Sequence, residues 1–159
     1  MAGSGWLRLA ALGAAAGGVL AGCQIDAQYG ANCTTSPPVP HQNFGVVDVS
    51  IDIPLFAEPG GTFVVTVFNM DASNGSTGQS PSGVISVTGP VTPSGTISVG
   101  SPYPNTLTFQ ATGQPGDVIH FNAESGFAIY GDFPTSGFGL NCDAGGPEIG
   151  TTTIRAPDG

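Results

Sequence analysis

The residues whose chemistry the sequence constrains most are three cysteines, Cys23, Cys33 and Cys142. A cysteine sulfur can bind a metal, carry an organic group or join a second sulfur in a disulfide. Zinc sites need closely spaced pairs of cysteine or histidine, whereas these cysteines are isolated and have no histidine nearby. We therefore expect no metal at these positions, and covalent chemistry at sulfur instead.

Cys23 follows a leader in which the single basic residue Arg8 precedes the uncharged run 9–22, rich in Ala, Gly and Leu. As a helix this run would span about 21 Å, less than the roughly 30 Å hydrocarbon core of a membrane, so export followed by cleavage is favoured. The segment Leu20-Ala21-Gly22-Cys23 resembles the lipobox of bacterial lipoproteins. The resemblance implies a signal peptide over 1–22, cleavage before Cys23 and acyl chains on the Cys23 sulfur. The alternatives are an ordinary secretory signal that leaves Cys23 a free thiol, and an uncleaved anchor.

Lipidation would place the protein on the extracytoplasmic face of the cell membrane, in the cell envelope. An exported chain meets oxidising conditions, so the two remaining cysteines, Cys33 and Cys142, are expected to form a disulfide. The bridge would close a loop of about 110 residues, for which the chain-entropy model gives roughly 4 to 5 kcal/mol of stabilisation. The alternative is a pair of buried free thiols.

Other constellations give no catalytic residues and no metal or cofactor site. No serine has glycine both two residues before and two residues after it, as a nucleophile elbow requires. His120 alternates with apolar neighbours over 118–121, which predicts an outward-facing strand residue, and His41 adjoins a proline-rich segment. The segment 71–76 has its glycine misplaced for a calcium loop. We interpret Asp132, Asp143 and Glu148 as solvated surface acids, with a weak calcium site at the end of the sandwich as the alternative.

Aromatic residues in the later loops are the candidate ligand contacts. Tyr103, Tyr130, Phe133 and Phe138 could form a platform for a sugar or a partner protein, and Tyr29 could join them. The same pattern is equally typical of core and edge packing, so both interpretations stay open. 

The charge balance excludes one class of partner. After the leader, the chain has eleven acidic residues and one basic residue, Arg155, which gives a formal net charge of −10. Such a surface repels phosphate backbones and anionic lipid headgroups, so nucleic-acid binding is excluded and peripheral membrane contact beyond the lipid anchor is disfavoured.

The pattern along the chain predicts an all-β fold. Residues 47–53 alternate apolar and polar, and β-prone runs follow at 62–68, 84–88, 96–99, 106–111, 118–122, 127–130 and 149–155. Turn residues rich in Gly and Pro separate most runs, and 69–83 is predicted to be a loop. We expect an Ig-like antiparallel β-sandwich of about seven strands, with a partly open barrel as the alternative. Its core is predicted to contain Phe63, Val65, Phe109, Ile119 and Phe121.

These elements predict four regions: a signal peptide over 1–22, a lipidated Cys23 and Pro-rich tether over 23–43, a sandwich domain over 44–155, and a flexible tail over 156–159. The segments 32–34, 57–63, 114–117 and 142–154 resemble actinobacterial secreted or surface proteins of unknown function that contain one Ig-like domain. The resemblance implies fold and compartment only. We expect a non-enzymatic envelope lipoprotein that binds a protein or cell-wall partner through its loops, with a carbohydrate or small-ligand binder as the alternative and a hydrolase as a distant third.

Overall fold

The computed structural model describes residues 23–36, 44–74, 78–80, 82–133 and 136–158, with side chains placed for 24–32, 45–73, 82–124 and 144–158. All regular structure in these ranges is β-strand, which confirms the predicted all-β class. Among the described residues there is no helix of the length and apolarity needed to span a bilayer. The strands are β1 (Cys23–Ser36), β2 (Phe44–Ile53), β3 (Phe56–Ala57), β4 (Thr62–Asn74), β5 (Gly78–Ser80), β6 (Ser82–Thr88), β7 (Val91–Thr92), β8 (Gly95–Gly100), β9 (Asn105–Ala111), β10 (Val118–Phe133), β11 (Ser136–Asp143) and β12 (Glu148–Ile154).

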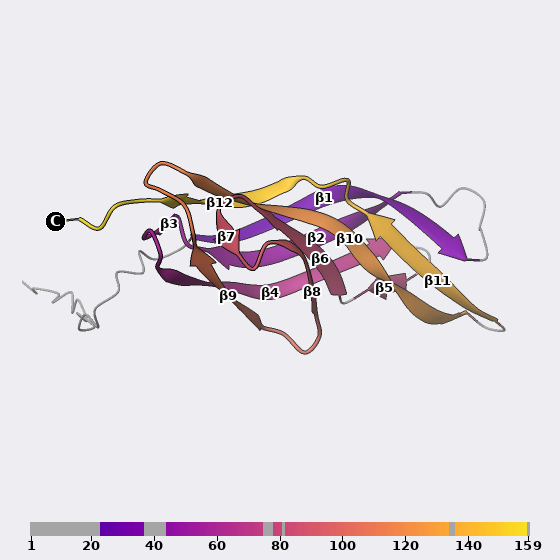
Figure 1. Cartoon of the computed structure of the whole chain (residues 1–159). Coiled ribbons are helices and arrows are strands. Elements are labelled where there is room, and N and C mark those ends of the chain that lie inside the picture. The colour runs from indigo at the N-terminus through magenta and orange to yellow at the C-terminus, as the bar shows by residue number, and fades with distance from the viewer. Residues whose placement is uncertain (1–22, 37–43, 75–77, 81, 134–135, 159) are drawn as a thin grey trace, which may run out of the picture.

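Hydrogen bonds join these strands continuously, and the resulting sheet folds over into two layers (Figure 1). One layer has the order β3-β12-β10-β6-β8, and the other has the order β1-β2-β4-β9-β7. β11 pairs with both β10 and β1 and so connects the layers along one side, while β5 pairs with the end of β4. Every ladder is antiparallel except that of β3 with β12. The architecture is therefore a two-layer β-sandwich.

The core lies between the layers and contains the residues that the sequence predicted. Phe63, Val65 and Phe109 enter it from one layer, and Ile119 and Phe121 from the other, all five buried. The Phe109 ring stacks on Phe63 at 5.6 Å between centroids and meets Phe121 edge-on at 5.7 Å. The contact of Phe109 with Phe121 crosses the interior and joins the two layers.

β2 shows why the strands form where they do. Val47, Val49, Ile51 and Ile53 are buried, whereas the intervening Asp48, Ser50 and Asp52 are partly exposed on the outer face. A strand directs alternate side chains to opposite faces, so this sequence satisfies both the core and water. Pro54, which has no amide hydrogen to donate to a ladder, follows the last residue of β2.

The expectation of a tether over 23–43 is wrong for residues 23–36, which form β1. Over 24–31 the exposed Gln24, Asp26 and Gln28 alternate with less exposed neighbours that end at the buried Ala31. Several inward positions hold alanine, so the apolar signal in the sequence is weak although the period is that of a strand. The sandwich therefore includes residues 23–36, ahead of the predicted start at residue 44, and 37–43 lie outside the described residues.

The predicted loop over 69–83 is also wrong for most of its length. β4 continues to Asn74, and Met70 and Ala72 are buried. A register shift separates the pair Ser50 and Asn69 from the pair Ile51 and Val67, so Phe68 is an extra residue in β4. Before this β-bulge the buried residues of β4 have odd numbers, and after it they have even numbers. A search for strict alternation therefore does not detect the second half of the strand. The count of about seven strands was low because β1, β5, β11 and the two-residue strands β3 and β7 were not recognised.

Candidate functional site

Cys23 lies at one end of the sandwich, which we call the Cys23 end. Its backbone pairs with that of Ile53, and the chain leaving β2 then forms β3 beside the end of β12. The Thr153 amide donates to the Leu55 carbonyl at 2.9 Å, and the Arg155 amide donates to the Ala57 carbonyl at 2.8 Å. Figure 1 shows the start of β1, β3 and the C-terminus together at this end.

Cys33 and Cys142 occupy directly opposite positions in the antiparallel ladder of β1 with β11. Opposite Cα atoms in such a ladder are about 4.5 or 5.5 Å apart, and both values fall within the roughly 4.4 to 6.8 Å that disulfides span. The side chains of Cys23, Cys33 and Cys142 lie outside those described. The backbone register is thus compatible with the predicted bridge, which stays a prediction.

A groove of about 410 Å³ runs over the outer face of β1, β2 and β4. We call it the outer-face groove; the side chains of Asp26, Gln28, Asp48, Ser50 and Asn69 line it. Asp26 lies opposite Ser50 and Gln28 opposite Asp48 in the β1–β2 ladder, while Ser50 lies opposite Asn69 in the β2–β4 ladder. Three strands that meet only through folding therefore build one polar surface.

Hydrogen bonds fix the polar groups of this groove. The Ser50 hydroxyl donates to Asp26 Oδ1 at 2.6 Å, and Gln28 Nε2 donates to Asp48 Oδ1 at 2.8 Å. Gln24 Nε2 reaches the Ser50 hydroxyl at 3.1 Å from the neighbouring outward position of β1. A carboxylate has two oxygens and about four acceptor positions, so these bonds orient the aspartates and leave acceptor capacity.

The β-bulge of β4 adds an aromatic ring to the same face. Because Phe68 is inserted into the ladder, Phe68 and Asn69 both lie outward between the buried Val67 and Met70. The Phe68 side chain is 42% exposed. An apolar ring thus stands next to an amide that lines the groove. This site was not predicted, because residues 24–32 were interpreted as part of a tether. The alternation of Gln24, Asp26 and Gln28 with less polar residues is the pattern that could have indicated a strand there.

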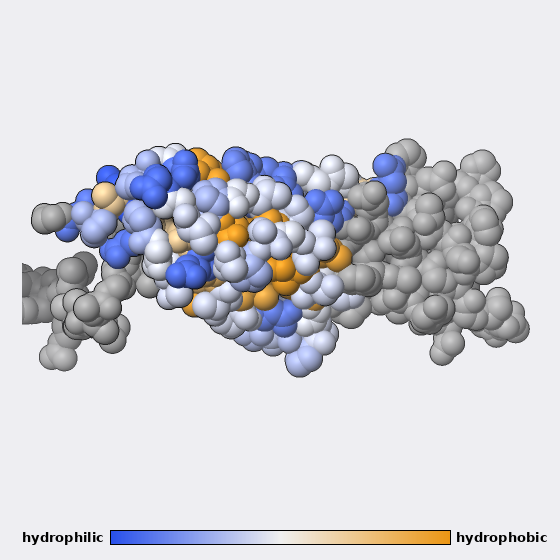
Figure 2. Space-filling model, in the orientation of Figure 1, coloured by the Kyte–Doolittle hydropathy of each residue, from blue (hydrophilic) through white to orange (hydrophobic). Residues whose placement is uncertain are grey.

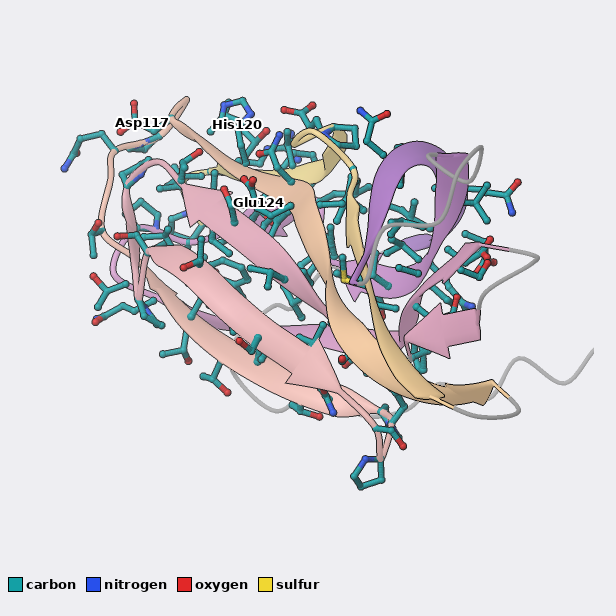
Figure 3. The ribbon with its side chains drawn as sticks, turned by 90° about the vertical axis from the view of Figure 1, so that its right-hand side faces the viewer. Asp117, His120 and Glu124 are labelled. Atoms are coloured by element: carbon teal, nitrogen blue, oxygen red, sulfur yellow. The ribbon has the colours of Figure 1, made fainter. Side chains whose placement is uncertain are left out.

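His120 faces outward, as predicted, and pairs with Glu148 across β10 and β12. Its Nδ1 is 2.6 Å from Glu148 Oε2, and the two side chains are 45% and 51% exposed. Figure 3 shows Asp117, His120 and Glu124 apart from one another along β10 and the turn before it. In the described part of the chain no three His, Cys, Asp or Glu residues form a group that could hold a metal ion.

A second hollow of about 290 Å³ lies at the Cys23 end. The Arg155 guanidinium carbon is 4.7 Å from the centroid of the Phe56 ring, a cation–π contact that orients the side chain. Glu58 and Asp158 also line this hollow. The only basic residue after the leader is thus held at the end where Cys23 lies.

Of the four aromatic residues predicted to contact a ligand, only Tyr103 has a described side chain, and that side chain takes part in the packing of the sandwich. Tyr103 packs against the core, and its hydroxyl donates to the Met70 carbonyl at 2.6 Å. Burial raises the pKa of the Tyr103 phenol above its ordinary value, with a smaller contribution from the Asp71 carboxylate. The side chains of Tyr130, Phe133 and Phe138 lie outside those described.

Two further predictions about acidic residues can be compared with the described residues. Asp71 lies in strand β4, so the segment that faintly resembled a calcium loop begins inside a strand, and 75–77 lie outside the description. Glu148 is bonded to His120, while the side chains of Asp132 and Asp143 lie outside the described set.

No protein-family model, curated protein or solved structure matches this chain.

Proposed function

We propose that this chain is a cell-envelope lipoprotein, held on the extracytoplasmic face of the cell membrane by acyl chains on Cys23, that binds a partner rather than catalysing a reaction. The observation that carries the proposal is the position of Cys23. Cys23 pairs with Ile53, the last residue of β2, and so lies at one end of the sandwich, from which acyl chains on its sulfur can reach a membrane. We further propose that the two layers follow an Ig-like arrangement.

The anchor is tested by mass spectrometry of the membrane fraction, which should find an acylated N-terminal cysteine. Each buried methylene contributes about 0.8 kcal/mol, so two or three chains hold the protein stably on the membrane. The Cys23→Ser variant should remain unprocessed or leave the membrane fraction. An unmodified, soluble wild-type protein would contradict the anchor.

For the partner, we propose a neutral oligosaccharide of the cell wall, bound in the outer-face groove. Sugar hydroxyls donate to carboxylates such as those of Asp26 and Asp48, and they accept from amides such as that of Asn69. The exposed Phe68 ring offers an apolar face against which the C–H groups of a sugar can pack. The hydrogen bonds already made by Ser50 and Gln28 preorganise the aspartates, which lowers the entropy lost on binding.

Charge selects among glycans. The outer positions of β1, β2 and β4 carry Asp26, Asp48, Asp52 and Asp71, and Arg155 lies at the Cys23 end instead. Carboxylates concentrated on one face repel anionic polymers, so teichoic-acid-like or uronic-acid chains are disfavoured. A neutral chain of hydroxyls meets no such repulsion.

Calorimetric titration with neutral cell-wall oligosaccharides tests this site. Asn69→Ala should weaken binding about two- to tenfold, the value of one ordinary hydrogen bond, and Phe68→Ala should weaken it at least as much. Val64→Ala is the matched control, because Val64 is 43% exposed on the same strand but lies five residues from the groove-lining Asn69, whereas Phe68 is adjacent to Asn69. Equal affinities of all three variants and the wild type would refute the groove as the site.

A protein partner is the second candidate, and the exposed side chains of β4 favour it. Val64 and Phe68 are two of the three exposed large hydrophobic residues in the described ranges, and both lie on this strand. On the face shown in Figure 2, apolar residues form small patches separated by polar ones. Protein interfaces of ordinary size combine such anchors with a polar rim. Cross-linking that Val64→Ala weakens, with no effect on glycan titration, would favour this candidate.

A further inference from the structure

At the Cys23 end the fold leaves no spacer between the proposed acyl chains and the first strand. Gln24 pairs with Asp52, Asp52 with Thr66, and Thr66 with Thr106, so these four residues lie level across four strands. From this level β1 extends one residue towards the Cys23 end, whereas β4 extends four residues, to Thr62. At about 3.3 Å per residue, Thr62 projects roughly 10 Å beyond Cys23.

This projection is comparable with the thickness of a lipid headgroup layer. A bilayer of about 40 to 45 Å with a 30 Å hydrocarbon core has roughly 5 to 7 Å of headgroups on each side. Acyl chains on Cys23 must enter the hydrocarbon core. The domain therefore cannot stand clear of the bilayer, and the parts of the Cys23 end that project beyond Cys23 must meet the headgroups.

The side chains at this end fit a zwitterionic headgroup layer. The Leu55 side chain is 46% exposed at this end and is therefore free to enter an apolar environment. Arg155, held over the Phe56 ring, can donate two hydrogen bonds to a lipid phosphate. The carboxylates of Glu58, Asp117 and Asp158 lie at the same end, and they repel lipids with a net negative charge.

We propose that the Cys23 end, with Leu55 and Arg155 at its centre, is a docking surface for zwitterionic phospholipid headgroups. The Leu55 side chain enters the interfacial region, and Arg155 binds a lipid phosphate from its position over Phe56. The sandwich consequently stands on the membrane by this end. The inference rests on the proposed acylation of Cys23.

The test uses the processed, lipidated protein in phosphatidylcholine vesicles that contain brominated phosphatidylcholine, a quencher of tryptophan fluorescence. The only tryptophan of the chain is Trp6, in the leader, so Leu55→Trp introduces a single probe into the processed protein. We expect this tryptophan to be strongly quenched and its emission shifted to the blue. Asn32→Trp is the matched control, because Asn32 is exposed on the same strand as Cys23 and about 30 Å further along it.

The outcomes separate this inference from the anchor. Protein that fails to float with the vesicles would overturn both proposals. Protein that floats with equal or no quenching of the two probes would overturn the docking surface alone. Twelve Gly and Ser residues inserted between Cys23 and Gln24 should abolish quenching of Leu55→Trp while flotation persists. Replacing half of the unbrominated phosphatidylcholine by phosphatidylglycerol, with the brominated lipid held constant, should reduce quenching, and unchanged quenching would overturn the assignment to zwitterionic lipid.

Discussion

Removing the predicted bridge between Cys33 and Cys142 should lower the stability of the domain by about 4 to 5 kcal/mol. The closed loop would contain about 110 residues, and restricting such a loop in the unfolded chain gives this value in the chain-entropy model. The two residues lie opposite each other in the ladder of β1 with β11, in which five register pairs fall within the described residues. This ladder joins the two layers, so the bridge would be a covalent link between them along that side.

Urea unfolding of the wild type and of the Cys33→Ser/Cys142→Ser double variant measures the effect. With a slope of roughly 1.5 to 2 kcal/mol per molar urea, the midpoint should fall by about 2 to 3 M. Circular dichroism reports the transition, since the processed chain has no tryptophan. Reductant should bring the wild type to the midpoint of the double variant and should leave that variant unchanged. Alkylation of both thiols in the unreduced protein, or coincident curves, would refute the bridge.

Three further predictions concern described residues. Phe109→Ala should cost about 3 to 5 kcal/mol in thermal or urea unfolding, because it removes a buried ring that contacts aromatic rings from both layers; a loss below 1 kcal/mol would contradict the core as described. Thr152→Val should cost roughly 1 to 3 kcal/mol, because the buried Thr152 hydroxyl donates to the Pro54 carbonyl at 2.6 Å and that acceptor would lose its partner. The absorbance titration of Tyr103, identified by comparison with Tyr103→Phe, should lie above the ordinary pKa of 10.0. Since the folded state then holds the proton more tightly, this contribution to stability is complete below that value and is lost as the pH rises through the folded pKa.

The sequence predicted the fold class and the core, but it missed parts of the strand set for identifiable reasons. Alternation in β2 and the phenylalanines of β4, β9 and β10 were sufficient to predict buried faces, because large apolar residues recur there at period two. β1 was missed because Ala27 and Ala31 are small and give little apolar signal. The end of β4 was missed because a bulge at Phe68 breaks the period.

The candidate site was less predictable than the fold. The outer-face groove unites Asp26 of β1, Asp48 of β2 and Asn69 of β4, and only the pairing register brings them together. Tyr103 was predicted as a ligand contact, yet its hydroxyl bonds to the Met70 carbonyl, a partner that a loop sequence does not reveal. In both cases the residue type indicated which groups the side chain could bind. The pairing of strands in the folded protein determined which groups it contacts.

The pair of Asn32 with Asp143 in the ladder of β1 with β11 joins segments more than a hundred residues apart, so closing the sandwich carries the entropy cost of a very long loop. On the proposed route of export, this contact could form only after β11 had crossed the membrane. The two layers would then be joined along this side only after nearly the whole chain had been translocated.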